Sequence, residues 1–324
     1  MSLAPYPLLP PRTTTTTPYV GIGIGLVAVS TASILIRYAQ LAGAPSLVIA
    51  AWRLGLAALV LTPVVLATKR AELAALGKRQ AGLALLSGAF LGLHFGAWIS
   101  SLAYTTVASS VVLVSSNPLF VALIAAVALK ERISRPVAAG LALTLAGAMT
   151  VGLSDLCGGP SGCPTGGELL KGPAILGDGL ALVGAAAGAV YYSAGRALRP
   201  TMSLTTYIFL TYGTAAVVLA GAVAAAGLPV TGYAPGVYGL FVLLALVPQL
   251  IGHSAFNWAL KYLPATYVAV TTLGEPVGSA LLAALLLGEV PSGIKLVGSG
   301  LILAGIAAAS WRSPTTEKAK IARE

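Results

Sequence analysis

Residues 117–134, NPLFVALIAAVALKERIS, and residues 275–292, EPVGSALLAALLLGEVPS, decide the fold. The two stretches are 158 residues apart, and residues 97–147 align without a gap with residues 255–305. Identical residues occupy 17 of the 51 aligned positions. They include a tyrosine, a proline, a glutamate, a serine and two glycines, which the abundance of alanine and leucine does not explain. The chain therefore contains an internal repeat.

Composition identifies the chain as a polytopic membrane protein. Of its 324 residues, 57% are hydrophobic and 9% are charged, whereas roughly a quarter of an ordinary soluble domain is charged. The mean hydropathy is +0.91. A soluble protein of this length could not hide so much apolar surface from water. The same composition excludes a disordered chain and a small protein built on disulfides.

Ten apolar runs are long enough for a membrane-spanning helix, which needs about 20 residues. We therefore expect an all-α membrane protein with ten transmembrane helices, because each helix satisfies its own backbone hydrogen bonds in lipid. The predicted spans are Tyr19–Ile36, Leu47–Thr68, Gln80–Ser101, Val107–Leu129 and Pro136–Leu153 in the first half, and Ala174–Gly195, Leu204–Ala226, Gly236–Trp258, Ala265–Leu287 and Gly293–Trp311 in the second half.

The distribution of positive charge predicts the orientation. If the N-terminus is cytoplasmic, 15 of the 19 lysine and arginine residues fall on the inner face, as the positive-inside rule requires. Both termini are then cytoplasmic, and the net charge of +10 reflects topology and not a nucleic-acid partner. Each half has an odd number of spans, so the second half enters the membrane from the opposite side. Such a 5+5 inverted-topology repeat suits alternating access, with a site near the midplane where the halves meet.

The predicted organisation has five parts. They are a disordered N-terminal tail over residues 1–18, a first five-helix repeat over 19–153, an extracytoplasmic loop over 154–173, a second repeat over 174–311 and a cytoplasmic tail over 312–324. The first span lacks the pattern of a cleaved signal peptide. Cys157 and Cys163 both lie in the loop, where an oxidising compartment would allow a disulfide; two free thiols are the alternative. We expect no metal site, because no histidine lies near these cysteines, and no cofactor.

Two motifs resemble those of a known family. Asn117-Pro118 followed by Leu129-Lys130-Glu131-Arg132 resembles the helix-4 signature of the drug/metabolite transporter superfamily, EamA type, and Glu275-Pro276 followed by Leu287-Gly288-Glu289 resembles its helix-9 signature. The segment Gly177–Leu182, GDGLAL, is similar to the family's usual start of helix 6. The resemblance implies export of small metabolites, often amino acids, from a prokaryotic cytoplasm. It identifies cargo poorly, because members of one fold carry different substrates.

Among the nine acidic residues, Glu275 is the one predicted at the centre of a span. An acid at membrane depth is costly and is therefore a functional candidate. Pro276 follows it and frees the carbonyl of Thr272, an arrangement that suits proton or cation coupling or capture of a substrate ammonium group. The alternative is a protonated glutamate that holds a kink by hydrogen bonding. Asn117, followed by Pro118, takes the equivalent place in the first half.

The two histidines, His94 and His253, fall in the third and eighth spans, within one residue of the repeat offset. A histidine can relay a proton near neutral pH, but a buried histidine can equally be a packing residue. Trp98 and Trp258 stand one turn further on, where their rings could receive an apolar group or a cation. The other polar and aromatic residues that could line a cavity are Ser30, Thr31, Ser33, Ser115, Ser116, Tyr191, Tyr192, Tyr212, Gln249, Asn257, Thr271 and Thr272.

The interpretation of Arg53 is structural. We expect it near the outer end of the second span, where a long side chain can snorkel to the interface. A salt bridge to Asp178 is the alternative. Glycines at four-residue spacing favour close helix packing, and the glycines concerned are Gly88, Gly92, Gly96, Gly184 and Gly188.

These observations predict a secondary transporter of the plasma (inner) membrane that exports small metabolites, amino acids above all, by alternating access. A facilitative carrier, or an exporter of drug-like cations, nucleosides or other metabolites, is the alternative. A membrane enzyme is less well supported because the sequence lacks a His-Glu-x-x-His motif, and an ATP-driven pump because it lacks a phosphate-binding loop. A channel is disfavoured by the inverted repeat. The expected partners are a small-molecule substrate, membrane lipid and protons, and the expected state is a monomer or weak dimer.

Overall fold

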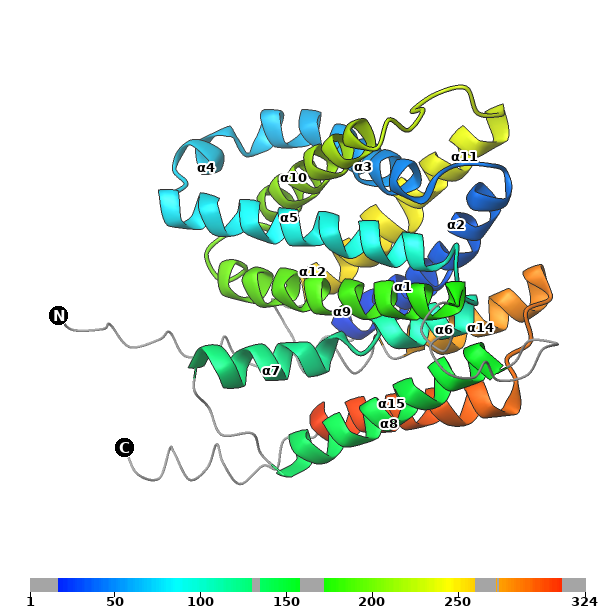
Figure 1. The fold of residues 1–324 in the computed structure, drawn as a ribbon. Helices are drawn as coiled ribbons and strands as arrows, with labels where there is room; N and C mark the ends of the chain where they lie inside the picture. Colours follow the sequence, from blue (N-terminus) through cyan, green and yellow to red (C-terminus); the bar gives the residue numbers. More distant parts are fainter. Residues whose placement is uncertain (1–16, 130–134, 158–171, 260–271, 273, 311–324) are drawn as a thin grey trace, which may run out of the picture.

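The computed structural model describes residues 17–129, 135–157, 172–259, 272 and 274–310, and every regular element in them is a helix (Figure 1). The elements are α1 (Thr17–Ser30), α2 (Ala32–Leu41), α3 (Ser46–Thr68), α4 (Arg70–Ala74), α5 (Lys78–Ser101), α6 (Val107–Val114), α7 (Asn117–Leu129), α8 (Arg135–Cys157), α9 (Pro173–Leu198), α10 (Leu204–Ala225), α11 (Pro235–Leu244), the π-helix η2 (Ala245–His253), α12 (Ser254–Ala259), α14 (Gly274–Leu287) and α15 (Gly293–Ser310).

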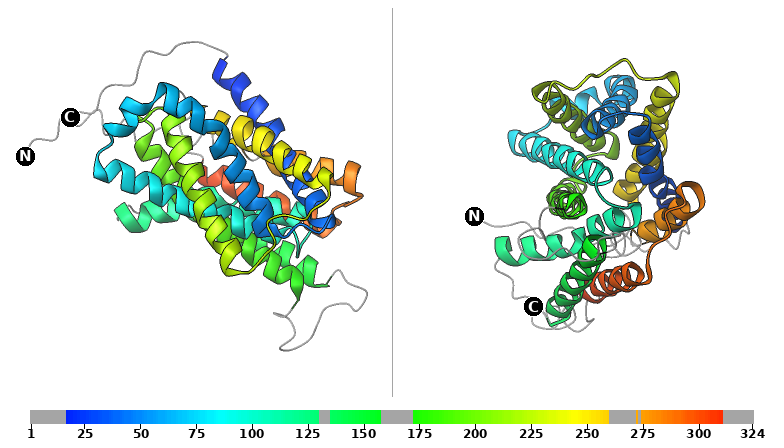
Figure 2. Two further views of the ribbon diagram at one scale, coloured as in Figure 1. Left: turned by 90° about the horizontal axis from the view of Figure 1, so that it is seen from above. Right: turned by 45° about the vertical axis from the view of Figure 1, so that its right-hand side comes forward.

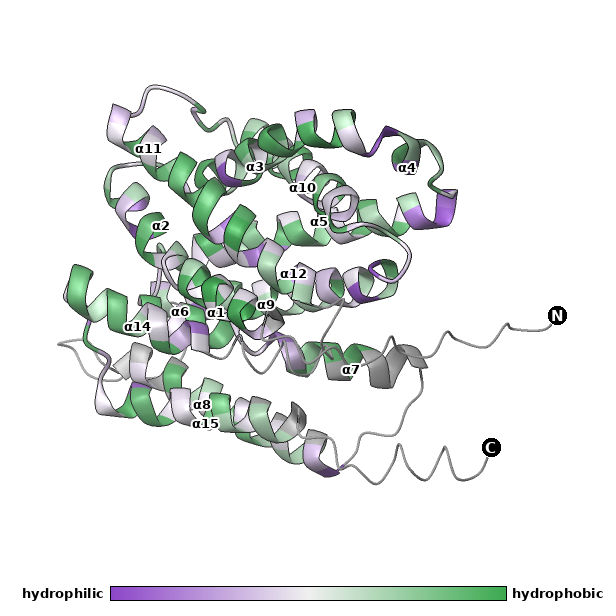
Figure 3. Ribbon diagram, turned by 180° about the vertical axis from the view of Figure 1, so that it is seen from behind, coloured by the Kyte–Doolittle hydropathy of each residue, from purple (hydrophilic) through white to green (hydrophobic). Residues whose placement is uncertain are grey.

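Six helical stretches in the described part are long and apolar enough to cross a membrane. They are Tyr19–Leu41, Ser46–Thr68, Lys78–Ser101, Pro173–Leu198, Leu204–Ala225 and Pro235–Ala259. Shorter apolar helices cover Val107–Val121, Ala138–Val151, Gly274–Leu287 and Gly293–Gly305. Hydrophobic residues accordingly occur along all of the long helices (Figure 3). The expectation of an all-helical membrane protein is confirmed, and the count of ten crossings stays a prediction.

The first and fourth predicted spans are each divided into two helices. α1 ends at Ser30 and Thr31 separates it from α2, and Ser115 and Ser116 separate α6 from α7. All four hydroxyls donate to carbonyl oxygens three or four residues earlier, at 2.6–2.9 Å. Such bonds compete with the helical pattern and bend helices. In the second case Pro118 adds to the effect, because it lacks the N–H that would continue the bonding.

The eighth predicted span is continuous but not uniformly α-helical. Its middle, Ala245–His253, is a π-helix that contains Pro248. A π-helical turn takes up an extra residue and therefore rotates the side chains that follow it; such segments are frequent at functional sites. This segment carries Gln249 and His253.

The last helices of the two repeats, α8 and α15, lie side by side along one edge of the molecule (Figures 1 and 2). A methyl group placed on Gly147 would lie 2.6 Å from the carbonyl oxygen of Gly298, and one placed on Gly305 would lie 2.6 Å from the carbonyl oxygen of Gly140. Gly147 and Gly305 are equivalent in the repeat, as are Gly140 and Gly298. The contacts are therefore reciprocal, and the two equivalent helices run antiparallel.

The long helix α9 lies in the middle of the bundle, where it packs on α5, α6, α7 and α8 (Figure 2). Small residues allow the close approach to α5. A methyl group on Gly184 would lie 3.3 Å from the carbonyl oxygen of His94, and one on Gly188 would lie 3.0 Å from His94 Nδ1. These glycines therefore serve helix packing, as small residues commonly do in membrane bundles.

Replacing Gly147 by alanine should destabilise the α8–α15 pair. The added methyl group would meet the backbone of α15, and overpacking of this kind costs about 1–3 kcal/mol. We expect the midpoint of thermal unfolding in detergent to fall by several degrees. Gly300→Ala, on α15, is the matched control because nothing lies within 4 Å of a methyl group there. Equal midpoints for the two variants would contradict the close contact.

Candidate functional site

Arg53 on α3 is completely buried, with 0% of its surface exposed. Its Nε donates a hydrogen bond to Gln249 Oε1 at 2.8 Å, and its guanidinium carbon lies 4.1 Å from the centroid of the Phe95 ring. Within the described residues its Nη1 and Nη2 atoms have no hydrogen-bond partner. The expectation that Arg53 snorkels to the interface is wrong, because packing against η2 and α5 holds the side chain inside the bundle.

The alternative expectation for Arg53, a salt bridge to Asp178, is also wrong. In the part of the chain that the structure describes, the ion pairs are Arg37–Glu289 and Lys69–Glu72. The guanidinium of Arg53 instead has Gln249 and Phe95 as its contacts. These two contacts fix the orientation of the guanidinium group, but neither supplies a negative charge to neutralise it.

Aromatic rings and a histidine surround this arginine. Trp98 lies 5.9 Å from the guanidinium carbon, measured to the ring centroid, and is stacked with His94 at 6.1 Å. Phe95 contacts His94 at 4.8 Å and His253 edge-on at 5.3 Å between centroids. The structure therefore brings together three predicted site residues, His94, Trp98 and His253. Phe95, around which they gather, gave no sequence signal beyond its place in an apolar span.

The two histidines differ in their hydrogen bonding. His94 Nδ1 lies 2.8 Å from the carbonyl oxygen of Gly184 on α9, so its ring joins α5 to α9. His253 Nδ1 is buried and has no hydrogen-bond partner among the described residues. The packing interpretation therefore suits His94, whereas His253 keeps a buried ring nitrogen without a hydrogen-bond partner in the described part of the chain.

A second group of predicted residues forms a hydrogen-bonded network beside the arginine. Asn257 Nδ2 donates to the Tyr191 hydroxyl at 2.8 Å and to the His253 carbonyl at 2.9 Å. The Tyr191 ring stacks on Tyr207 at 6.3 Å, and the Tyr207 hydroxyl lies 3.0 Å from Ser87 Oγ. This network joins α12, α9, α10 and α5, so it fixes the positions of helices from both repeats.

Glu275 lies in the first turn of α14, and its backbone N–H donates to the Thr272 carbonyl at 2.9 Å. Its carboxyl group is near enough to Arg53 and Tyr192 to interact electrostatically. Within the described residues it forms no direct ion pair with Arg53. The Arg53 guanidinium and the Glu275 carboxyl group, which come from different repeats, are thus within electrostatic range but not in an ion pair. Pro276, which follows, occupies the first turn of α14, where proline is tolerated.

The remaining predicted residues lie at other contacts. Ser116 caps the break between α6 and α7 by donating to Leu113, and Asn117 lies beside Gly188 of α9. Trp258 packs on α1, next to Gly21. The residues of the predicted disulfide, Cys157 and Cys163, cannot be compared, because Cys163 lies outside the described residues.

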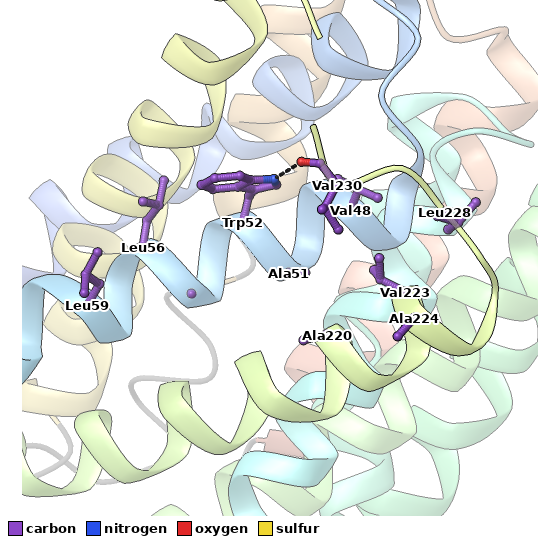
Figure 4. A pocket seen from close by; sticks show the side chains of 11 residues that line it. Val48, Ala51, Trp52, Leu56, Leu59, Ala220, Val223, Ala224, Leu228 and Val230 are labelled. Atoms are coloured by element: carbon purple, nitrogen blue, oxygen red, sulfur yellow. Dashed lines mark hydrogen bonds between the residues drawn. The ribbon is translucent and has the colours of Figure 1, made fainter. Parts of the chain in front are cut away.

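A cavity of about 320 Å³ lies between α3 and α10, away from this polar cluster (Figure 4). Its lining is apolar apart from the indole N–H of Trp52, which donates to the Val230 carbonyl at 3.0 Å. The lining consists of Val48, Ala51, Trp52, Gly55, Leu56, Leu59, Ala220, Val223, Ala224, Leu228 and Val230. Such a surface can hold a hydrocarbon chain but offers no group that could orient a polar metabolite. The cluster around Arg53 is therefore the candidate site.

One end of the bundle is closed by polar interactions of Glu289 and Arg37. Arg37 Nη2 lies 3.0 Å from Glu289 Oε1 and donates to the Thr105 carbonyl at 3.0 Å. Glu289 Oε2 accepts from the Val107 N–H at 2.9 Å. These interactions join α2 and the α5–α6 connection, in the first repeat, to the residues after α14, in the second. Arg37 lies within α2, which continues to Leu41, whereas the predicted span stopped at Ile36.

The opposite end of the bundle carries another link between the repeats. Glu72 Oε1 on α4 accepts from the Ser203 N–H at 2.7 Å, and Lys69 lies 3.8 Å away as an ion pair. Partial burial acts to raise the pKa of Glu72, but hydrogen bonds from Ser203 and Thr206 and the charge of Lys69 lower it below its ordinary value. The link therefore involves an ionised carboxylate near neutral pH.

Comparisons with known proteins concern the family and the fold of the chain. A model of the EamA-like transporter family matches residues 18–153 and 175–311. No curated protein matches. A solved structure described as "Crystal structure of protein" is similar with a TM-score of 0.57 and 21% sequence identity, over 94% of this chain and 99% of that chain. At this identity the likeness supports the fold alone.

Removing the Glu289 carboxylate should open the end of the bundle that it closes. We expect Glu289→Ala to raise roughly tenfold the rate at which a membrane-impermeant maleimide labels Ser110→Cys, a position that is 0% exposed, because hydrogen bonds to charged groups contribute about 1.5–3 kcal/mol each. The measurement uses a protein in which both native cysteines are replaced, Cys157→Ser/Cys163→Ser, so that the introduced cysteine alone is labelled. Glu72→Ala, which weakens the opposite end, is the control and should leave the labelling rate unchanged or lower it. A rise with Glu72→Ala, or none with Glu289→Ala, would contradict the assignment.

Proposed function

This chain belongs to the EamA-like transporter family, and on that premise we propose that it is a secondary transporter that exports small metabolites, amino acids above all, by alternating access. We place it in the plasma membrane of a prokaryote, with ten spans, both termini cytoplasmic and no cofactor. The family is one of transporters, which agrees with the expectation that the chain is not an enzyme.

The inverted arrangement of the repeats is supported by two independent observations. The positive charges fall mostly on one face when ten alternating spans are assumed. The equivalent helices α8 and α15 run antiparallel and contact each other through equivalent glycines. Antiparallel equivalent helices are what a two-fold axis in the membrane plane would produce, and in such a fold each half can adopt the conformation of the other.

One observation carries the proposal more than any other, namely the buried polar cluster between the two repeats. Arg53 and Phe95 come from the first repeat, whereas Gln249 and His253 come from the second. Links between the repeats close the bundle at opposite ends, at Glu289 and at Glu72. A polar site that is enclosed in this way suits a carrier, in which one end opens at a time, better than a channel, which needs a continuous path.

Transport by the purified protein tests this proposal. The full chain in proteoliposomes should exchange labelled amino acids in a counterflow assay, with saturation at high concentration. No exchange of any amino acid would contradict the proposed cargo, and the same assay with nucleosides and drug-like cations would then test the alternatives. An unsaturable flux of all solutes would contradict the carrier and favour a channel.

Glu275 is the group that we propose for proton coupling, with His253 as the second candidate. Glu275→Gln keeps the size and hydrogen-bonding capacity of the side chain but removes its charge change. We expect the variant to keep exchange at equal pH, within about threefold of wild type, and to lose the additional uptake that a pH gradient drives. Gradient-driven uptake that survives in Glu275→Gln would contradict the role. A wild-type protein that does not respond to pH would indicate facilitated diffusion.

A further inference from the structure

The candidate site contains more buried hydrogen-bond donors than acceptors. Within the described residues, four buried nitrogen atoms around Arg53 that can only donate have no hydrogen-bond partner: Nη1 and Nη2 of Arg53, Nε1 of Trp98 and Nε2 of Gln249. The Nδ1 atom of His253, which can donate or accept, also has none. Arginine, the tryptophan indole and an amide NH₂ group can only donate. A buried donor without an acceptor costs about 1–3 kcal/mol, and a charged donor costs more. What this site lacks is therefore an acceptor.

No described residue accepts a hydrogen bond from these four atoms. The carboxyl group of Glu275 interacts with Arg53 electrostatically, but within the described residues it forms no direct ion pair with it. The side chain of Gln249 already accepts from Arg53 Nε through its one carbonyl oxygen. A negatively charged molecule would satisfy several of these donors at once.

We propose that Arg53 binds the carboxylate of the transported molecule, and that a free carboxylate is the feature by which this site recognises its substrate. The proposal rests on the transport function proposed above and narrows its substrate class. It assigns to Arg53 the role of a binding residue, which differs from the interfacial role that its sequence position suggests.

The surroundings of Arg53 hold its guanidinium ready for such a ligand. Gln249 fixes the Nε side, and the Phe95 ring covers one face. The two Nη atoms are left as a planar pair, whose spacing matches the two oxygen atoms of a carboxylate. Because the group is already fixed, little conformational entropy is lost when a ligand binds.

The charges nearby favour one kind of carboxylate. Arg53 supplies a single positive charge, and Glu275 lies within electrostatic range of it. A dianion such as a phosphate monoester would bring two negative charges close to Glu275. A molecule that carries an ammonium group beside its carboxylate would instead place opposite charges against both residues. An α-amino acid with an uncharged side chain fits this distribution.

Matched competitors test the proposal on the wild-type full chain. In the counterflow assay, each transported amino acid should compete at least tenfold more strongly than its amide, its methyl ester or the amine that lacks the carboxylate. Loss of a charged hydrogen-bonding partner has an effect of this size. Equal competition by acid and amide would overturn the proposal while leaving the transport function intact.

Two variants test whether Arg53 causes the preference for the acid over its amide. Arg53→Lys keeps the positive charge but loses the planar pair of donors, and should reduce the preference for acid over amide. Arg53→Gln removes the charge, and its preference should fall to about one. Arg135→Gln, which removes an exposed arginine at the start of α8, is the control and should keep the wild-type preference. An acid-over-amide ratio that is unchanged in Arg53→Gln would also overturn the proposal.

A binding measurement tests the carboxylate proposal independently of transport. The thermal midpoint of the purified protein in detergent should rise with the amino acid and not with its amide, and Arg53→Gln should abolish that difference. If wild-type protein exchanges no amino acid, the transport proposal fails. The rise in thermal midpoint then decides the carboxylate proposal: it must appear with the acid and be absent with the amide. If Arg53→Gln does not fold, the wild-type acid and amide series and Arg53→Lys still decide it.

Discussion

The burial of one positive charge is the constraint on which the centre of this protein depends. An arginine inside a membrane-embedded bundle is costly unless its surroundings compensate for lost water. Here Gln249 accepts one hydrogen bond and Phe95 covers one face, at 2.8 Å and 4.1 Å. These contacts fix α3, α5 and η2 relative to one another. They stabilise the arginine only in part, because its two Nη atoms have no partner in the described part of the chain.

Irregular helix geometry supplies the positions that this centre needs. The π-helix Ala245–His253 carries both Gln249 and His253, and Pro248 lies within it. A regular helix would present these two side chains at a different angle, because the π turn contains an additional residue. Close glycine contacts have the opposite role. Gly184 and Gly188 let α9 approach α5 closely enough for His94 to reach a carbonyl of α9, which makes that part of the bundle rigid.

The two repeats share their framework but differ in their polar residues. Equivalent glycines make reciprocal contacts between α8 and α15, so the framework keeps the symmetry that the sequence repeat implies. Asn117 and Glu275 take equivalent places before a proline, and His94 and His253 differ in their hydrogen bonding. A symmetric framework permits the exchange of conformations on which alternating access depends, whereas an asymmetric centre can bind a molecule that is itself asymmetric.

The sequence by itself determined that this is an all-helical membrane protein built from two related halves, and it placed most helices to within a few residues. Hydropathy, run length and a fixed repeat offset are local properties that can be read along the chain. It also picked out His94, Trp98 and His253, which the structure gathers around Phe95, and Asn257 and Tyr191, which form the hydrogen-bonded network beside them. The tertiary structure alone decided that Arg53 points inward, that Phe95 and Gln249 hold it, and that Arg37 pairs with Glu289. Arg53 and Gln249 are 196 residues apart, and the direction of a side chain depends on which distant helix packs against it.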